Sequence, residues 1–304
     1  MYNGILIVDK PAGWTSHDVI AKLRGALKQK RIGHGGTLDP MATGVLPVFI
    51  GRATRAAEFC ENAEKEYIAE LKLGVVTDTQ DITGNVLAEN EVRTTYEELC
   101  TVLPRFRGAQ KQIPPMYSAV KKDGKKLYEL ARKGIDIPRE ARDITISKLE
   151  LLSNSESSKL DGQKCEHTYT LQVECSKGTY IRTLCHDIGA ALGCGGTLSA
   201  LQRTRAGVYT IEMSHSLDTI LDALDTASND NFTENFLFTV DSIFSNYPKI
   251  SINELESRKA KNGAMVLAQG DNKDGRYRVY APNGEFLLLG EMKNNKIKTI
   301  KSFF

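Results

Sequence analysis

The strongest constraint on the fold is a strand-like alternation of side chains that recurs along the chain between helical segments. In KEYIAELKL (residues 65–73) every second side chain from Tyr67 to Leu73 is apolar, and HTYTLQVEC (167–175) repeats the pattern. A period of two is typical of a strand with one face on the core. Helical patterns lie between these strands in mixed order, so we expect an α+β fold with a mixed, mainly antiparallel sheet.

Caps and turn residues define further elements. Ser16 is the expected N-cap of a helix over 17–29, and Thr94 with Glu97 has the spacing of a capping box that starts another helix. The dipeptide Asp123-Gly124 indicates a tight turn. Periodicity assigns the other segments: strands at 4–8, 45–50 and 142–152, and helices at 52–63, at 127–132 and from Thr179 or Tyr180 to about 192.

Charge and length divide the chain unequally. The 304 residues are enough for one large or two unequal domains. The net charge of +2 conceals an acidic segment, 206–248, which has seven acidic residues and no Lys or Arg. We expect a main domain over 1–248 that includes this acidic helical connection, with helices at 216–225 and 234–245 and a loop between them. A small β-rich domain is expected over 249–304.

In this small C-terminal domain, a helix is expected over 253–261 and precedes short strands. The dipeptides Asp274-Gly275 and Asn283-Gly284 are expected as hairpin turns between them. The expected strands lie at 264–268, 276–280, 286–290 and 296–300.

Several classes of protein are excluded by pattern. Apolar runs stay far below the roughly 18 residues of a spanning helix, and no signal peptide is visible at the N-terminus, so we expect a cytoplasmic protein without membrane contact. The six cysteines form no C-x-x-C pair and the five histidines show no zinc-ligand spacing. We therefore expect idle thiols and no metal site.

The loop GHGGTLDPMATG (33–44) is the most informative segment for chemistry. It lacks the Lys of a phosphate-binding loop. Asp39 precedes Pro40, which favours an extended backbone, and His34 lies five positions earlier. Such a carboxylate can serve as a nucleophile or an acid/base, or it can simply satisfy backbone N–H groups in an Asp-Pro turn.

Three further segments allow a functional and a structural interpretation. In SKGTYIRTLCHDIG (176–189), Arg182 can clamp a carboxylate or lie on the surface. Tyr67 can stack on a flat substrate or fill the core. The segment 113–134 interleaves six Lys or Arg residues with Tyr117 and Tyr128, which suits either RNA binding or a solvated hairpin.

These segments, taken together and in order, resemble one family. GILIVDKPAGWTSHDVI, GHGGTLDPMATGVLPVFIG, KEYIAELKLG, IPPMYSAVK with GKKLYELAR, and SKGTYIRTL with DIG are similar to motifs of the bacterial tRNA pseudouridine synthases of the TruB type, over about residues 4–210. The resemblance implies isomerisation of the T-loop uridine at tRNA position 55, with the tRNA T-arm as partner. It also implies a PUA-like C-terminal domain, although the similarity there is weak.

The resemblance assigns a role to three catalytic residues. Asp39 matches the family's aspartate nucleophile, and Arg182 matches the arginine that pairs with it. Tyr67 matches the tyrosine that stacks on the target base and is implicated in removing the proton from C5. An arginine beside Asp39 favours the ionised carboxylate in a cleft where burial opposes it.

Other matched residues line the substrate site or support it. Tyr180 matches a residue of the substrate pocket, Leu201 an apolar wall of the uracil pocket, and His34 the histidine that enters the RNA stack and helps to flip out the uridine. Lys10 and Pro11 match a motif that supports the catalytic loop. The sequence departs from the family pattern at Gly35, Gln202 and His186, outside the chemistry proposed.

The chemistry of pseudouridine formation limits the cofactors and the alternative functions to be considered. Pseudouridylation breaks a C–N bond and forms a C–C bond without redox change, so no cofactor is expected, and Asp39 can attack either C1′ or C6. A hydrolytic glycosidase normally needs two carboxylates. The alternatives left open are a non-catalytic tRNA-binding or RNA-folding protein and a guide-RNA-dependent synthase. We expect a monomer that needs no guide RNA.

Overall fold

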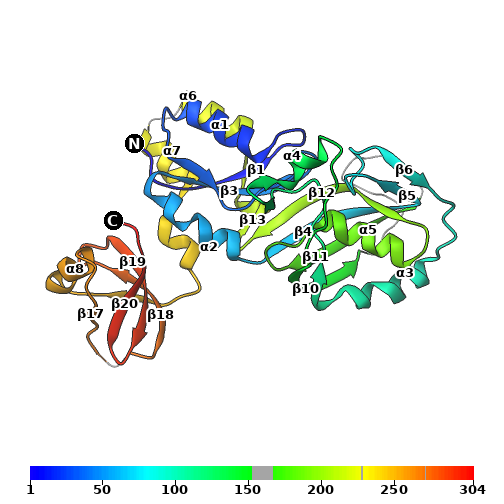
Figure 1. Ribbon diagram of the computed structural model, residues 1–304. Helices are drawn as coiled ribbons and strands as arrows, with labels where there is room; N and C mark the ends of the chain where they lie inside the picture. Colours follow the sequence, from blue (N-terminus) through cyan, green and yellow to red (C-terminus); the bar gives the residue numbers. More distant parts are fainter. Residues whose placement is uncertain (153–166, 227–228, 271) are drawn as a thin grey trace. The chain divides into compact units, whose positions relative to one another are not determined.

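The computed structural model describes residues 1–152, 167–226, 229–270 and 272–304 (Figure 1). Contacts within the chain separate two compact units. The first unit contains residues 1–38, 45–61 and 207–304, and the second contains 39–44 and 62–206. The loop that carries Asp39 thus belongs to the second unit, although the residues on either side of it belong to the first.

The first unit is built on the buried strand β1 (Gly4–Lys10), which pairs in parallel with β14 (His215–Ser216) and antiparallel with β15 (Leu237–Phe238). Helix α1 (Ser16–Ala26) buries one apolar side against this core. The remaining elements of the N-terminal part are β2 (Ile32–His34), β3 (Thr43–Ile50), the 3₁₀ helix η1 (Gly51–Ala56) and α2 (Ala57–Asn62).

Both predicted helix caps are wrong by one residue. Thr15, and not Ser16, is the N-cap of α1 and forms a capping box with Asp18. Thr95 with Glu98, and not Thr94 with Glu97, caps α3 (Tyr96–Val102). Two adjacent hydroxyl residues are equivalent in sequence, and only the direction of the chain entering the helix decides between them. Because Thr15 caps α1, the hydroxyl of Ser16 can form hydrogen bonds with the backbone of Leu38.

The acidic segment folds onto the core of the first unit. Leu217 and Ile220 of α6 (Leu217–Thr226) are buried in the same cluster as Phe232 of α7 (Asn229–Phe236). The second predicted helix, at 234–245, is wrong: α7 begins earlier, over residues predicted as a loop, and 3₁₀ helices η3 (Ile211–Met213) and η4 (Val240–Phe244) complete the segment. The sequence SNDNFTEN is polar and therefore predicts a loop. Burial of the Phe232 ring in the core overrides this local preference.

The C-terminal part of the first unit is a five-stranded sheet with one helix, α8 (Glu254–Lys261). The strands lie in the order β16-β18-β19-β20-β17. This β-rich arrangement agrees with the expectation for 249–304. The strands are β16 (Lys249–Ser251), β17 (Val266–Leu267), β18 (Gly275–Tyr280), β19 (Phe286–Lys293) and β20 (Lys296–Ser302).

Of the two hairpin turns predicted in this sheet, one is confirmed and one is wrong. Asn283-Gly284 joins the antiparallel pair β18–β19, with Gly284 at φ 84°. Asp274-Gly275 is not a hairpin, because β17 pairs with β20 and not with β18. The second hairpin turn is Asn294-Asn295, where both residues have positive φ, a conformation that Asn tolerates.

A hydrogen-bonded carboxylate attaches the sheet to the acidic segment. Tyr280 donates its hydroxyl to Asp241 at 2.5 Å, and the Arg278 guanidinium lies 3.7 Å from the same oxygen. Burial alone raises the pKa of Asp241, but hydrogen bonds from Thr239 and Tyr280 together with Arg278 outweigh it and hold the pKa below its ordinary range.

We expect Asp241→Asn to lower the free energy of unfolding by about 1–2 kcal/mol at neutral pH, because a charge-assisted contact is lost. A carboxyl whose pKa is lower in the folded state stabilises the fold above its unfolded pKa, near 3.9, and loses this contribution as the pH falls through the folded value. Urea titrations of both proteins should therefore differ at pH 7, and the difference should shrink progressively as the pH falls below about 4. A constant difference at all pH values would contradict this account.

The second unit is built on five antiparallel strands in the order β12-β4-β11-β10-β7. The first residues of β3 add a parallel pairing with β12, so the sheet is mixed and mainly antiparallel, as predicted. The five strands are β12 (Gly196–Ala206), β4 (Lys65–Leu73), β11 (Thr168–Cys175), β10 (Arg142–Leu151) and β7 (Gly108–Gln112).

Helix α5 (Ile181–Ala191) packs on this sheet at a glycine contact. A Cβ at Gly189 would lie 2.1 Å from the backbone nitrogen of Gly196 in β12, so only glycine permits this approach. The smaller elements of this unit include two hairpins, β5 (Val75–Thr77) with β6 (Val86–Glu89) and β8 (Lys121–Lys122) with β9 (Lys125–Lys126). They also include the 3₁₀ helix η2 (Leu103–Phe106) and α4 (Leu127–Ala131). Strand β13 (Tyr209–Thr210), which follows β12 along the chain, belongs to the first unit. The predicted Asp123-Gly124 turn is confirmed between β8 and β9.

Among the described helices, none combines the length and the apolar character that crossing a membrane requires. The polar stretch between β10 and β11, predicted as a connection, and Cys165 lie outside the described residues.

Candidate active site

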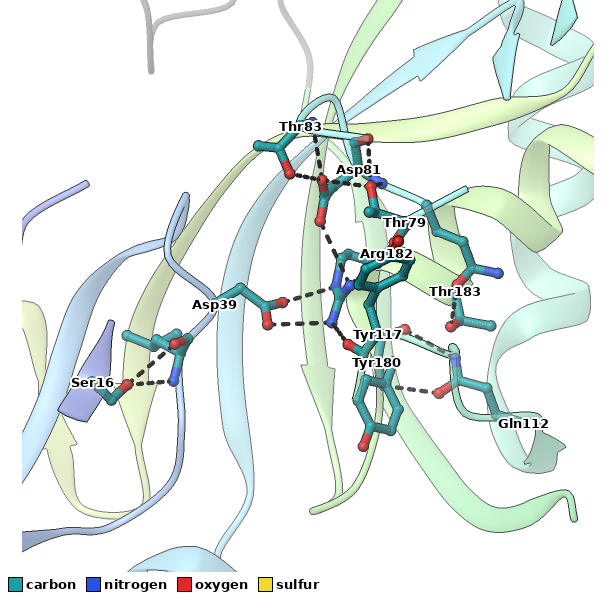
Figure 2. A network of polar contacts seen from close by, with 12 residues as sticks. Ser16, Asp39, Thr79, Asp81, Thr83, Gln112, Tyr117, Tyr180, Arg182 and Thr183 are labelled. Carbon is teal, nitrogen blue, oxygen red and sulfur yellow. Dashed lines mark hydrogen bonds and ion pairs between the residues drawn. The ribbon is translucent and has the colours of Figure 1, made fainter. Parts of the chain in front are cut away.

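The backbone that leads to Asp39 is held by a buried serine. The hydroxyl of Ser16 donates to the carbonyl of Leu38 at 3.2 Å and accepts from the N–H of Leu38 at 2.9 Å (Figure 2). Ser16 occupies the first turn of α1, and the loop before that helix is held by Lys10, whose ammonium donates to the carbonyls of Pro11 and Trp14. The residue preceding Asp39 is thus fixed at both of its backbone polar groups.

The other end of the same loop is fixed by a close backbone approach. Gly44 lies beside Arg203 of β12 and has φ +99°. A Cβ on Gly44 would lie 2.2 Å from the carbonyl oxygen of Arg203, a distance that no side chain can adopt. The residues on both sides of the five-residue segment from Asp39 to Thr43, which are Leu38 and Gly44, are therefore held in place.

We expect Gly44→Ala to destabilise the protein by about 3 kcal/mol, because the methyl group forces the loop and β12 apart. Because the loop carries Asp39, any activity that depends on this carboxylate should also fall in the folded variant. Thermal unfolding checks the first effect. Gly134→Ala is the matched control, because Gly134 has φ +70° and its surroundings leave open space within 4 Å of the position that a Cβ would take. Equal losses in both variants would show that the conformation of the glycine matters and the close approach does not.

Asp39 and Arg182 form a two-point ion pair. The Nε of Arg182 lies 2.9 Å from Oδ2 of Asp39, and its Nη2 donates to Oδ1 at 3.2 Å (Figure 2). The side chain of Arg182 is only 5% exposed, whereas that of Asp39 is 34% exposed. The cation is therefore buried behind a carboxylate that reaches solvent, which leaves the carboxylate accessible to a substrate.

Besides Asp39, two backbone carbonyls orient the guanidinium of Arg182. Nη1 donates to the carbonyl of Thr79 at 3.1 Å, and Nη2 donates to the carbonyl of Tyr117 at 2.9 Å. A planar group held on several sides cannot rotate away from Asp39. The predicted pairing of Arg182 with Asp39 is thus present in the structure, and the alternative of a surface arginine is wrong.

A second carboxylate, Asp81, lies 3.6 Å from Nη1 of Arg182 and was not predicted from the sequence. Its side chain is 7% exposed, and its Oδ1 accepts hydrogen bonds from the hydroxyl groups of Thr79 and Thr83 (Figure 2). The available signal was the run TDTQDITG (77–84), in which hydroxyl residues surround each Asp. Arg182 therefore lies between a buried carboxylate and an accessible one.

Tyr67 lies on β4 at the same level of the sheet as Gly44, the residue that ends the loop carrying Asp39. In the register of the strands Tyr67 pairs with Arg203, and Arg203 pairs with Gly44. Burial raises the pKa of Tyr67; the Arg203 guanidinium opposes this rise, and the negative charge of Asp39 adds to it. The phenol is consequently neutral at physiological pH and electrostatically coupled to Asp39.

The remaining predicted site residues are placed as follows. Leu201 is buried on β12, opposite Ala69 of β4. Tyr180 is the N-cap of α5, two residues before Arg182. These residues belong to the same unit as Asp39 and Tyr67. His34 ends β2 in the first unit, paired with Val48, and is the one predicted site residue outside the second unit.

The basic segment 113–134, which suits either RNA binding or a solvated hairpin, includes the β8–β9 hairpin and α4. Lys126 and Arg132 both lie over the ring of Tyr128, at 5.4 Å from its centre. Tyr117 lies on the adjoining loop, and its carbonyl contacts Arg182. Arg182 thus connects the site to this basic segment.

The described part of the chain contains no group of three or more His, Cys, Asp or Glu residues arranged to hold a metal ion. The cysteines in that part are free thiols, and burial raises the pKa of Cys175 to about 11. Such a thiol is a poor nucleophile at neutral pH.

Comparison with known proteins identifies the class. Three family models match successive parts of the chain: TruB family pseudouridylate synthase (N-terminal domain) at 24–181, tRNA pseudouridylate synthase B C-terminal domain at 182–245, and pseudouridine synthase II TruB, C-terminal, at 248–300. The tRNA pseudouridine synthase B of Syntrophomonas wolfei is 43% identical over 98% of this chain and 96% of its own length. That of Clostridium kluyveri is 39% identical over 99% of each.

The fold agrees with these sequence relatives. The crystal structure of a Cbf5–Nop10–Gar1 complex contains a chain that matches 99% of this one with a TM-score of 0.72 at 26% identity, and 85% of that chain is covered. Fold and relatives together define the protein as a pseudouridine synthase, an isomerase. The chain belongs to the TruB family and forms pseudouridine in tRNA.

Proposed function

We propose that this enzyme isomerises uridine 55 in the T-loop of tRNA and that Asp39 is its nucleophile. The observation that carries the proposal is the ion pair of Asp39 with Arg182, in which a buried, immobilised cation holds a carboxylate that is one-third exposed. The guanidinium favours the ionised, nucleophilic form of Asp39. The loop fixed at Leu38 and Gly44 limits the positions that the carboxylate can take.

The reaction needs no redox partner. The Asp39 carboxylate adds to C1′ with release of N1, or it adds to C6 of the base and the C1′–N1 bond breaks afterwards. The uracil then turns so that its C5 bonds to C1′, and the bond to Asp39 breaks. C5 loses its proton and N1 gains one. Atoms and electrons balance within the substrate, because the carboxylate is regenerated and one proton is exchanged with solvent.

Tyr67 is assigned to the base. An aromatic ring on the sheet beside the catalytic loop can stack on uracil. Because burial raises its pKa, Tyr67 carries its proton at neutral pH. Its hydroxyl can therefore receive the C5 proton only while it passes its own proton on.

Uridine must leave the RNA stack before Asp39 can reach it. We assign Tyr180 and Leu201 to the pocket that receives the flipped base, and His34 to the space that the base vacates. The domain at 249–304, which we propose to be PUA-like, and the basic hairpin would contact the RNA backbone. Such contacts recognise the shape of a folded T-arm.

A minimal substrate tests the T-loop assignment and the absence of a guide RNA or partner protein. We expect the purified chain to convert a synthetic T-arm hairpin, with pseudouridine appearing at position 55 and at no other uridine. Replacing that uridine by cytidine should abolish product formation. Tight binding of the hairpin without conversion would favour a tRNA-binding role, and release of free uracil would indicate a glycosidase.

A further inference from the structure

Gln112, the last residue of β7, attaches the start of α5 to the sheet through both ends of its side-chain amide. Its Oε1 accepts from the N–H of Tyr180 at 2.8 Å, and its Nε2 donates to the carbonyl of Tyr180 at 3.0 Å (Figure 2). A backbone N–H only donates and a carbonyl only accepts, so the orientation of the amide is unambiguous. The side chain thus imitates a strand pairing between residues 68 positions apart.

Tyr180 lies where the backbone enters α5, so its contact with Gln112 affects the start of this helix. Tyr180 is the N-cap of α5, and no side chain caps the helix there. Its backbone sets the direction in which the helix begins, and Arg182 is the second residue of that helix. Gln112 is 5% exposed, so water does not compete for the two hydrogen bonds.

Other contacts hold the body of α5 without Gln112. The hydroxyl of Thr183 donates to the side chain of Gln80 at 2.7 Å. Further along the helix, Gly189 lies against Gly196 of β12. Loss of Gln112 therefore leaves the helix on the sheet and loosens only its start at Tyr180, two residues before Arg182.

We propose that Gln112 is a positioning residue for pseudouridine formation, acting through the backbone of Tyr180 to aim Arg182 at Asp39. The inference rests on the proposed roles of Asp39 and Arg182. Gln112 does not touch the reacting atoms; it fixes the residue that orients them. A shift of about 1 Å in such an arrangement lowers turnover by up to about 100-fold.

The test compares Gln112→Leu with a matched control, Gln110→Leu. Gln110 lies on the same strand, and its side-chain amide also donates to a backbone carbonyl, that of Phe106 in η2 and not that of the α5 N-cap. We expect Gln112→Leu to lower kcat about 10- to 100-fold with tRNA affinity changed less than about twofold. Gln110→Leu should retain kcat within about threefold. Equal kcat values for the two variants would overturn the proposal.

A double-mutant cycle separates positioning from a general loss of structure. If Gln112 acts through Arg182, Gln112→Leu should cost much less in an Arg182→Lys background than in the wild type. Equal fold-losses in both backgrounds would contradict the proposal. Should Gln112→Leu not fold, Gln112→Glu keeps the acceptor for the Tyr180 N–H and removes only the donor, and a kcat unchanged in that variant would contradict it equally. An inactive wild type would instead count against the proposed function.

Discussion

Asp39→Asn is expected to lower turnover by about four orders of magnitude or more while tRNA binding stays within a few-fold of the wild type. The amide keeps the volume of the side chain and lacks its negative charge, so it cannot add to C1′ or C6. Binding should persist because the RNA contacts assigned to the basic hairpin and the C-terminal domain do not involve this residue. Nucleoside chromatography of digested tRNA and a filter-binding titration measure the two effects separately.

Loss of binding in step with turnover would contradict this division of roles. Asp39→Ala is the companion variant. It should be equally inactive, because the reaction depends on the charge of the carboxylate and not on its bulk. A large difference in turnover between the Asn and Ala variants would indicate that Asp39 acts by holding the loop.

Arg182→Met is the second large effect, and we expect it on both activity and stability. The substitution leaves Asp39 and Asp81 without their shared cation and removes the donor to the carbonyls of Thr79 and Tyr117. Breaking a buried ion pair in this way costs about 3–5 kcal/mol. Turnover should fall about 1,000-fold, since the carboxylate is neither oriented nor kept ionised.

Arg182→Lys is the control for charge. A lysine retains the cation but cannot bind a carboxylate at two points or reach two carbonyls in the same plane. We expect this variant to fold near the wild-type stability and to recover only part of the activity. Thermal unfolding and single-turnover rates for the three proteins test this order. Wild-type turnover in Arg182→Met would contradict the role of the ion pair.

Much of the fold was predictable, because alternation and turn residues are local signals. The strands at 65–73 and 167–175 and the turns at Asp123-Gly124 and Asn283-Gly284 were confirmed. Where prediction was wrong, contacts distant in sequence decided the structure. The polar stretch around Phe232 is helical, because the helix buries the Phe232 ring in the core.

The candidate site was predictable only in part. The resemblance pointed to Asp39 and Arg182, and their pairing is present in the structure. Asp81, Ser16 and Gln112 were missed as parts of the site because each acts through a contact made in space. The sequence predicts Ser16 as the N-cap of α1. In the structure Thr15 is the N-cap, and the hydroxyl of Ser16 bonds to Leu38 instead. No local pattern marks Gln112, whose partner is 68 residues away.

The most direct test of the central claim is tritium release from tRNA that carries the label at C5 of uridine 55 alone. Excess enzyme is mixed with this tRNA, with the wild type and Asp39→Asn side by side. We expect complete release by the wild type within the first turnover and none above background by Asp39→Asn, although both bind the tRNA. Release by Asp39→Asn at a rate near that of the wild type, or no release from position 55 by a wild type that binds the tRNA, would contradict the account.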